Sequence, residues 1–136
     1  MNVLVVEAGI LPYEKEIDGL HDMQKLVGGH IQAIYPFQDN VTLVCNEDGL
    51  RLNLEFNRSV PERSYGSVFG TFFVCGLGEE DFTSLTPEQV KTYTERFKKA
   101  EILIAVKGHN PFTLKVDPLP KYPPEQPKHP RKPPTR

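Results

Sequence analysis

The chain is poor in cysteine, in tryptophan and in net charge, and each shortage excludes a class of protein. Of its 136 residues only two are cysteine and none is tryptophan, and the formal net charge at pH 7 is -2. Cys45 and Cys75 each lie among apolar residues and cannot form a disulfide framework, so we expect two reduced core thiols. The small net charge excludes an acidic mimic of DNA, and it leaves no concentrated basic surface for duplex DNA.

Long hydrophobic runs are also lacking. A membrane-spanning helix needs roughly 18 consecutive apolar residues, and no run here approaches that length. The first residues carry a short apolar run without a preceding basic region, which is not typical of a secretory leader. We therefore expect no membrane association and a cytoplasmic protein. Hydrophobic residues make up 38% and charged residues 25% of the chain, enough apolar material for one core.

The patterns in the first half of the chain predict short strands and one short helix. Residues 3–7 form an apolar, β-branched run, and residues 13–17 alternate between apolar and polar side chains. Two such runs joined by a turn predict a hairpin. Asp18 can cap a helix over residues 20–27, which Gly28 and Gly29 end. Residues 30–37 and 41–56 supply further apolar runs, with turn-favouring residues at 38–40 and 46–49, and these predict an antiparallel meander. The strongly apolar residues 67–76 predict a central strand covered on both faces.

The second half begins with the clearest helix signal in the sequence. Thr86 is the expected N-cap, Pro87 occupies the first helical position, and Gln89 completes a capping box. Residues 101–106 and 112–116 then predict two closing strands around a turn. Antiparallel hairpins with two helices predict an α+β fold, with a mostly antiparallel mixed sheet.

The last twenty residues differ in composition from the rest. Residues 117–136 contain eight prolines, and five Lys or Arg against two acids. Such a segment favours polyproline II and has too few apolar residues to fold alone. We therefore predict one α+β domain over residues 1–116 and a flexible, proline-rich basic tail over 117–136.

The sequence offers few motifs for chemistry. Gly76 and Gly78 stand where a dinucleotide-binding turn would begin, but the acidic residues at 79–81 would repel a phosphate. Carboxylates at predicted strand ends could serve as general bases or lie in solvated turns; these are Glu7, Glu47 and Asp48. The histidines lack metal-ligand spacing; they are His21, His30, His109 and His129. We expect no metal, no cofactor and no catalytic set.

One polar face suggests binding. Residues 51–57 alternate strictly, so a strand there would place polar side chains on one face, namely Arg51, Asn53, Glu55 and Asn57. Asn57 and Arg58 end this face, and amides with a guanidinium can read a planar or nucleotide-like ligand. The face could equally be the solvated side of a one-sided sheet.

We predict a ligand-binding set on and beside this polar face, with Arg58 as its most important member. A salt bridge from Arg58 to the acidic loop at 78–81 is the competing use of this side chain. The predicted set is Asn46, Glu47, Asn53, Asn57 and Arg58.

Three blocks of the sequence resemble a known family. They cover residues 24–37, 43–58 and 70–89, which read QKLVGGHIQAIYPF, LVCNEDGLRLNLEFNR and GTFFVCGLGEEDFTSLTPEQ. In this order they are similar to the family catalogued as domain of unknown function 3846, over about residues 2–97. The chain departs from the family pattern at three positions: His30 replaces a tyrosine, Asp48 a glutamate and Glu55 a proline.

The resemblance implies a setting but no reaction, because proteins like these are encoded largely by bacteriophages, plasmids and conjugative elements. The resulting hypothesis is a non-catalytic binding protein that acts in the bacterial cytoplasm in counter-defence or host takeover. It would sequester a nucleotide-like ligand or block a host protein. One alternative is a small hydrolase of a nucleotide signal with Glu47 or Glu7 as general base. The other is a pure protein-interaction module, and a homo-oligomer stays open.

Overall fold

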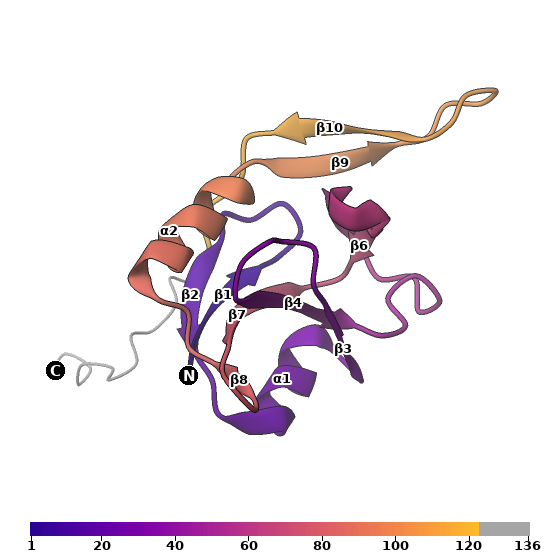
Figure 1. Ribbon diagram of the computed structural model, residues 1–136. Helices are drawn as coiled ribbons and strands as arrows, with labels where there is room; N and C mark the ends of the chain where they lie inside the picture. The colour runs from indigo at the N-terminus through magenta and orange to yellow at the C-terminus, as the bar shows by residue number, and fades with distance from the viewer. Residues whose placement is uncertain (123–136) are drawn as a thin grey trace, which may run out of the picture.

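The computed structural model describes residues 1–122 (Figure 1). It contains two α-helices, α1 and α2, one short 3-10 helix, η1, and ten strands. The helices are α1 (Gly19–Val27), η1 (Glu62–Ser64) and α2 (Pro87–Arg96). The strands are β1 (Asn2–Val6), β2 (Tyr13–Glu16), β3 (Ile31–Ile34), β4 (Val41–Asn46), β5 (Phe56–Val60), β6 (Gly66–Phe69), β7 (Phe72–Leu77), β8 (Phe82–Thr83), β9 (Ala100–Ile104) and β10 (Phe112–Val116).

One antiparallel sheet organises the domain. Its strands run in the order β2-β1-β7-β4-β3, and β8 pairs with β7. Two hairpins, β5–β6 and β9–β10, form separate two-stranded sheets. The helices and the mostly antiparallel sheet confirm the predicted α+β fold.

Strict alternation along the strands builds a core on each face of this sheet. In β1, Val3 and Val5 point to the side covered by α1, whereas Leu4 and Val6 point to the side covered by α2 and the β5–β6 hairpin. β7 lies in the middle of the sheet, and its first five residues are buried. Side chains on both faces thus exclude water, which is the main favourable contribution to folding.

Local signals set the ends of the two helices. Thr86 accepts a hydrogen bond from the Gln89 backbone, and the Gln89 side chain accepts one from the Thr86 backbone, which confirms the capping box. Gly28 ends α1 with a φ of 78°, a left-handed conformation that glycine adopts without steric cost. Asp18 precedes α1 as predicted, but its side chain makes no cap hydrogen bond; its N–H instead donates to Asp22.

The expected turn after residue 46 is present, but the strand predicted to follow it, over residues 50–56, begins only at Phe56. Residues 47–53 form consecutive turns, in which the Leu52 N–H donates to the Asp48 carbonyl and the Leu54 N–H donates to the Gly49 carbonyl. The alternating leucines therefore do not share a strand face, and Leu50 is 70% exposed. The predicted strand over 67–76 is likewise divided, because Gly70 (φ 86°) separates β6 from β7.

The described part of the predicted tail contacts the domain. Leu119 exchanges backbone hydrogen bonds with the loop between β1 and β2, through Gly9 and Leu11, at 3.0 and 2.8 Å. Lys121 forms an ion pair with Glu7 at 2.8 Å. Residues 123–136 of the predicted tail lie outside the described residues. Neither helix of residues 1–122 combines the length and the apolar character needed to cross a membrane.

Candidate functional site

The five predicted ligand-binding residues do not form one exposed face. Glu47 and Asn53 are exposed on the turns that follow β4, whereas the other three are buried. The expected solvent-exposed polar face is wrong at Asn57 and Arg58, because both side chains are fully buried. Their role in ligand binding stays a prediction, but each already has partners within the protein.

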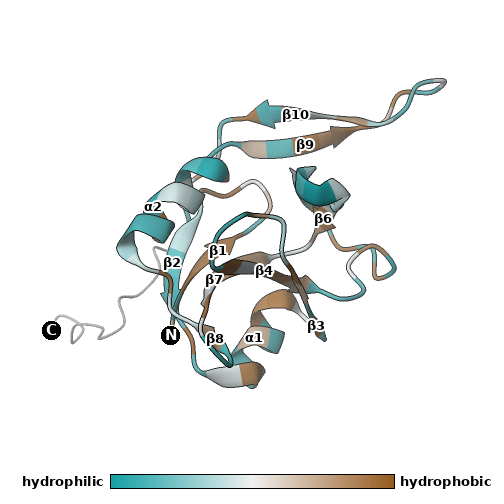
Figure 2. Cartoon of the chain, in the orientation of Figure 1, coloured by the Kyte–Doolittle hydropathy of each residue, from teal (hydrophilic) through white to brown (hydrophobic). Residues whose placement is uncertain are grey.

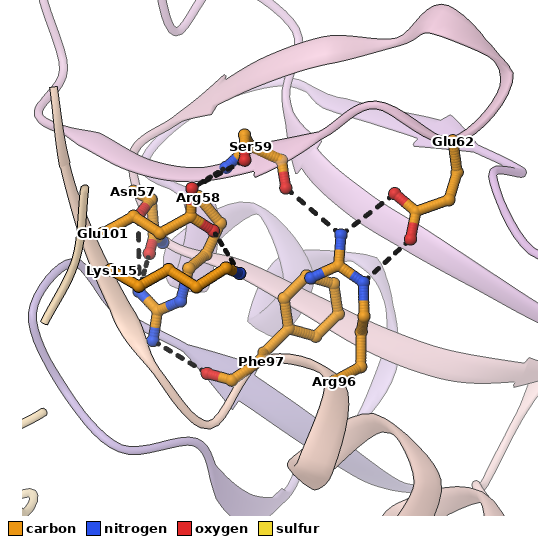
Figure 3. Close-up of polar contacts among 8 residues, drawn as sticks. All are labelled: Asn57, Arg58, Ser59, Glu62, Arg96, Phe97, Glu101 and Lys115. Carbon is orange, nitrogen blue, oxygen red and sulfur yellow. Dashed lines mark hydrogen bonds and ion pairs between the residues drawn. The ribbon is translucent and has the colours of Figure 1, made fainter. Parts of the chain in front are cut away.

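Arg58 lies at the centre of a buried polar network (Figure 3). Its guanidinium donates to the carbonyl oxygens of Ile10 at 3.0 Å and Phe97 at 3.1 Å, and to Asn57 Oδ1 at 2.7 Å. Longer bonds reach the carbonyls of Glu7 and Asn57, at 3.4 and 3.3 Å. One side chain therefore joins the β1–β2 loop, β5 and the residue that ends α2.

The environment of Arg58 is unusual for a charged group. Burial lowers its pKa to about 10, while the nearby Glu101 carboxylate opposes that change and the Arg96 cation adds to it. A pKa of about 10 still leaves the guanidinium protonated at neutral pH. Its Nε has no hydrogen-bond partner among residues 1–122. The predicted salt bridge to the acidic loop at 78–81 is not formed, since the partners of Arg58 are carbonyl and amide oxygens.

Asn57 orients this arginine. Its amide nitrogen donates to the carbonyls of Val6 and Gly70, both at 2.9 Å, which leaves Oδ1 to accept from Arg58. Gly70 is closely packed as well, because a Cβ there would lie 2.7 Å from the side chain of Leu54. The family block at 54–58 thus forms a structural junction between β1, β5 and the β6–β7 turn.

A second arginine extends the network toward solvent. Arg96 forms a two-pronged ion pair with Glu62, at 2.8 and 2.9 Å, and its guanidinium lies 4.6 Å from the ring centre of Phe97. Figure 3 shows Arg58 and Arg96 on either side of this residue. Glu101 accepts from the N–H and hydroxyl of Ser59, at 3.1 and 2.6 Å. These contacts attach β9 and α2 to β5.

Asn46 is also committed to an internal junction. Its amide donates to the Val27 carbonyl at 3.0 Å and accepts from the Asp48 N–H at 2.7 Å, so it joins the end of α1 to the turn after β4. A Cβ on Gly29 would lie 2.9 Å from the Asn46 amide nitrogen. The glycine pair after α1 and the Asn46 turn therefore pack against each other.

A small cavity lies beside Asn46 and Glu47. Its volume is about 250 Å³, below the roughly 300–1,000 Å³ typical of pockets for drug-sized ligands. The lining combines side chains from β3, β4 and β6 with Tyr65; it comprises Gln32, Ile34, Cys45, Asn46, Glu47, Gly49, Leu50, Tyr65, Ser67, Val68 and Phe69. A nucleotide would fit only partly inside.

A larger cavity of about 480 Å³ lies near Glu7 and Tyr13, between β2 and α1. Tyr13 and Lys121 both donate hydrogen bonds to the Glu7 carboxylate. Burial tends to raise the pKa of Glu7, but these hydrogen bonds outweigh burial and lower it below the usual 4.5. A lowered pKa makes this carboxylate a weaker proton acceptor than an ordinary glutamate, which disfavours Glu7 as a general base.

The other reactive groups are structural in the described part of the chain. Cys45 and Cys75 are buried and unpaired, and burial raises their pKa to about 11 and about 12. Neither thiol is a thiolate at neutral pH, so neither is an activated nucleophile. Within residues 1–122 no three His, Cys, Asp or Glu side chains gather in a group that could hold a metal ion.

Several exposed apolar side chains gather on the β9–β10 hairpin, which projects from the body of the molecule (Figure 1). Its register pairs Ile104 with Phe112, Ile102 with Leu114 and Ala100 with Val116. Side chains of directly opposite residues share one face of a sheet. We call this surface the hairpin face; it comprises Ala100, Ile102, Ile104, Phe112, Leu114 and Val116.

The hairpin face is apolar from base to tip; it is buried at Ala100, half-buried at Ile104 and Val116, and exposed at its other three residues. Ala100 is covered by the domain, whereas Ile102, Phe112 and Leu114 are 43%, 46% and 48% exposed. Brown, hydrophobic stretches are visible on both strands in Figure 2. The sequence predicts these two strands but not their exposure. A signal for this exposure was present in the sequence. Apolar residues occupy alternate positions in both strands, and residues 117–122 contain no apolar run that could cover that face.

The chain matches the family described as domain of unknown function (DUF3846) over residues 1–98. It belongs to this family. The match extends from β1 to the end of α2 and confirms the resemblance seen in the three sequence blocks. No curated protein and no solved structure matches the chain.

The DUF3846 match ends before the hairpin. Residues 1–98 hold the main sheet, both helices and the Arg58 network except for Glu101, whose carboxylate also lies 4.0 Å from the ammonium group of Lys115. β9 and β10, and with them the whole hairpin face, follow the matched region. Membership of DUF3846 therefore describes the domain that carries the hairpin, and the hairpin has to be interpreted from its own chemistry.

Proposed function

We propose that this DUF3846 chain is a non-catalytic binding protein that uses the hairpin face to bind another protein. The setting is the cytoplasm of a bacterium that carries a phage or mobile element, and the outcome is inhibition of the bound host protein. The observation that carries the proposal is the projecting hairpin, with three large apolar side chains more than 40% exposed on one uncharged face.

Exposing these apolar side chains to water costs free energy, and a partner that covers them removes this cost. Burial of apolar surface contributes roughly 25 cal/mol per Å², and contiguous exposed apolar patches mark interaction surfaces in soluble proteins. A two-stranded hairpin is also marginal on its own and gains stability when it is covered. The protein-blocking role is thus better supported than nucleotide sequestration, because Asn57 and Arg58 already bind internal groups.

Variants of the hairpin face test the proposal directly. Ile102→Lys places a charge in the centre of the face, while the half-exposed position limits its effect on folding. We expect affinity capture from the bacterial host to retain one protein with the wild type and to lose it with Ile102→Lys. Leu50→Lys is the matched control, because Leu50 is an exposed leucine on the turns after β4 and does not belong to the hairpin face. Equal loss with both variants, or retention with both, would contradict the proposal.

A nucleotide screen addresses the other two functions. We expect no thermal shift with mono-, di- or cyclic nucleotides. A shift with intact nucleotide recovered after denaturation would favour sequestration instead, and recovery of a hydrolysed product would favour the hydrolase. Glu47→Gln then separates these two, because only hydrolysis needs its carboxylate as a base.

A further inference from the structure

β10 has an open edge. Within residues 1–122 it pairs with β9 alone, and β9 is held on its other side by the hydrogen bonds from Ser59 to Glu101. Alternate backbone N–H and C=O groups of an edge strand point outward without a strand partner, and this makes the strand a template for pairing. Figure 1 shows no other element beyond β10.

The usual protections against edge pairing are weak in this strand. β10 pairs with β9 in one continuous register over five residues, so no bulge twists its edge away. Pro111 and Pro118 lie outside the strand and limit the pairing length without interrupting it. Lys115 is the one charged residue of β10, and it lies on the face opposite to the hairpin face.

We propose that β10 pairs with β10 of a second copy of this chain, antiparallel, with the two-fold axis at Leu114. The four strands β9-β10-β10-β9 then form one sheet, and the two hairpin faces form one continuous apolar surface. Each Phe112 lies opposite a Val116 of the other copy. Aromatic and β-branched residues are a favourable cross-strand pair.

Charge selects this register over its neighbours. With the axis at Leu114, each Lys115 lies opposite a Thr113, and like charges do not meet. An axis at Lys115 would place the two lysines directly opposite each other, which is unfavourable. An axis at Thr113 would place each Lys115 opposite Pro111 and would shorten the pairing. A shift by a single residue would bring the apolar face of one hairpin to the polar face of the other.

The interface is small, so the dimer is weak. A five-residue strand pair buries less than the roughly 1,200 Å² of a standard stable interface. We expect a concentration-dependent equilibrium with a dissociation constant in the range of about 10 µM to 1 mM. Dimer formation does not depend on the proposed host partner, because it uses the edge of β10 and leaves the hairpin face free.

Two opposite substitutions at one position test the register in sedimentation velocity experiments on the full chain. Thr113→Lys places two lysines opposite each other at two symmetric sites and should weaken dimerisation roughly 2- to 30-fold. Thr113→Glu places a glutamate opposite each Lys115 and should strengthen it by a similar factor. The double variant Thr113→Lys, Lys115→Glu exchanges the two charges and should associate more tightly than the wild type, as Thr113→Glu does, although it also loses the 4.0 Å contact between Lys115 and Glu101. Equal effects of Thr113→Lys and Thr113→Glu would overturn the register.

Cysteine cross-linking provides a second measurement. Leu114→Cys brings two thiols together on the axis and should give a disulfide-linked dimer with an added mild oxidant. Phe112→Cys is the control and should stay uncross-linked, since it faces Val116. The native thiols Cys45 and Cys75 are buried. A chain that remains monomeric at about 1 mM, without cross-linking of Leu114→Cys, overturns the dimer. The Ile102→Lys capture test is unaffected by that outcome.

Discussion

Replacing Arg58 by alanine should unfold the domain partly or completely under mild conditions. The substitution removes three short hydrogen bonds, to Ile10, Phe97 and Asn57. Bonds from a charged donor contribute about 1.5–3 kcal/mol each, or about 5–9 kcal/mol together. The cost of burying the guanidinium, several kcal/mol, offsets part of this, so we expect a net loss of about 3–5 kcal/mol. That is a large share of the roughly 5–15 kcal/mol that stabilises a typical domain.

Urea unfolding followed by circular dichroism measures this loss. Arg51→Ala is the matched control: Arg51 is also an arginine near β5, but it is exposed and paired only with Asp48 three residues away. We expect the control to change the free energy of unfolding by less than about 1 kcal/mol. Arg58→Lys keeps the charge but loses the planar arrangement of donors. Its free energy of unfolding should therefore lie between those of Arg58→Ala and Arg51→Ala. A normally stable Arg58→Ala protein that no longer binds its partner would refute the structural role and restore Arg58 as a ligand residue.

Three further predictions concern other junctions of the fold. Asn46→Ala should cost about 1–3 kcal/mol in chemical unfolding, because one buried and one partly buried hydrogen bond are lost; a change below about 0.5 kcal/mol would contradict it. The pKa of Glu62 is lowered by the hydrogen bond from Arg96, so its stabilisation is present above the usual 4.5 and is lost as the pH falls through the folded value. The stability difference between wild type and Glu62→Gln should therefore shrink on acidification, and a constant difference would exclude this linkage. A chain ending at Tyr122 should be more stable than one ending at Val116 by about 1–2 kcal/mol, because only the longer chain keeps the two backbone hydrogen bonds of residue 119; equal melting curves would show that these contacts contribute nothing.

The elements predicted correctly are those whose signals lie within a few residues. The capping box of Thr86 and Gln89 defines the start of α2 because all its partners are in one turn. The β1–β2 hairpin follows from an apolar, β-branched run, a short turn and an alternating run. The same kind of reasoning failed over residues 51–55, where alternation indicated a strand. There the chain closes a loop instead, and Leu54 after the loop packs against Gly70, a contact sixteen positions away in sequence.

The amino-acid sequence by itself determined the α+β class, the two helices with their caps and most of the strands, because propensity, period and capping are local properties. It also determined the family through its three blocks. Only the tertiary structure decided which polar residues are buried and which apolar residues are exposed. Arg58 is buried because carbonyls at residues 10 and 97 converge on it, and no local pattern contains that convergence. Ile102 and Leu114 are exposed for the complementary reason, since the domain covers only the base of the hairpin face, at Ala100. Apolar side chains are removed from water only where another surface packs against them.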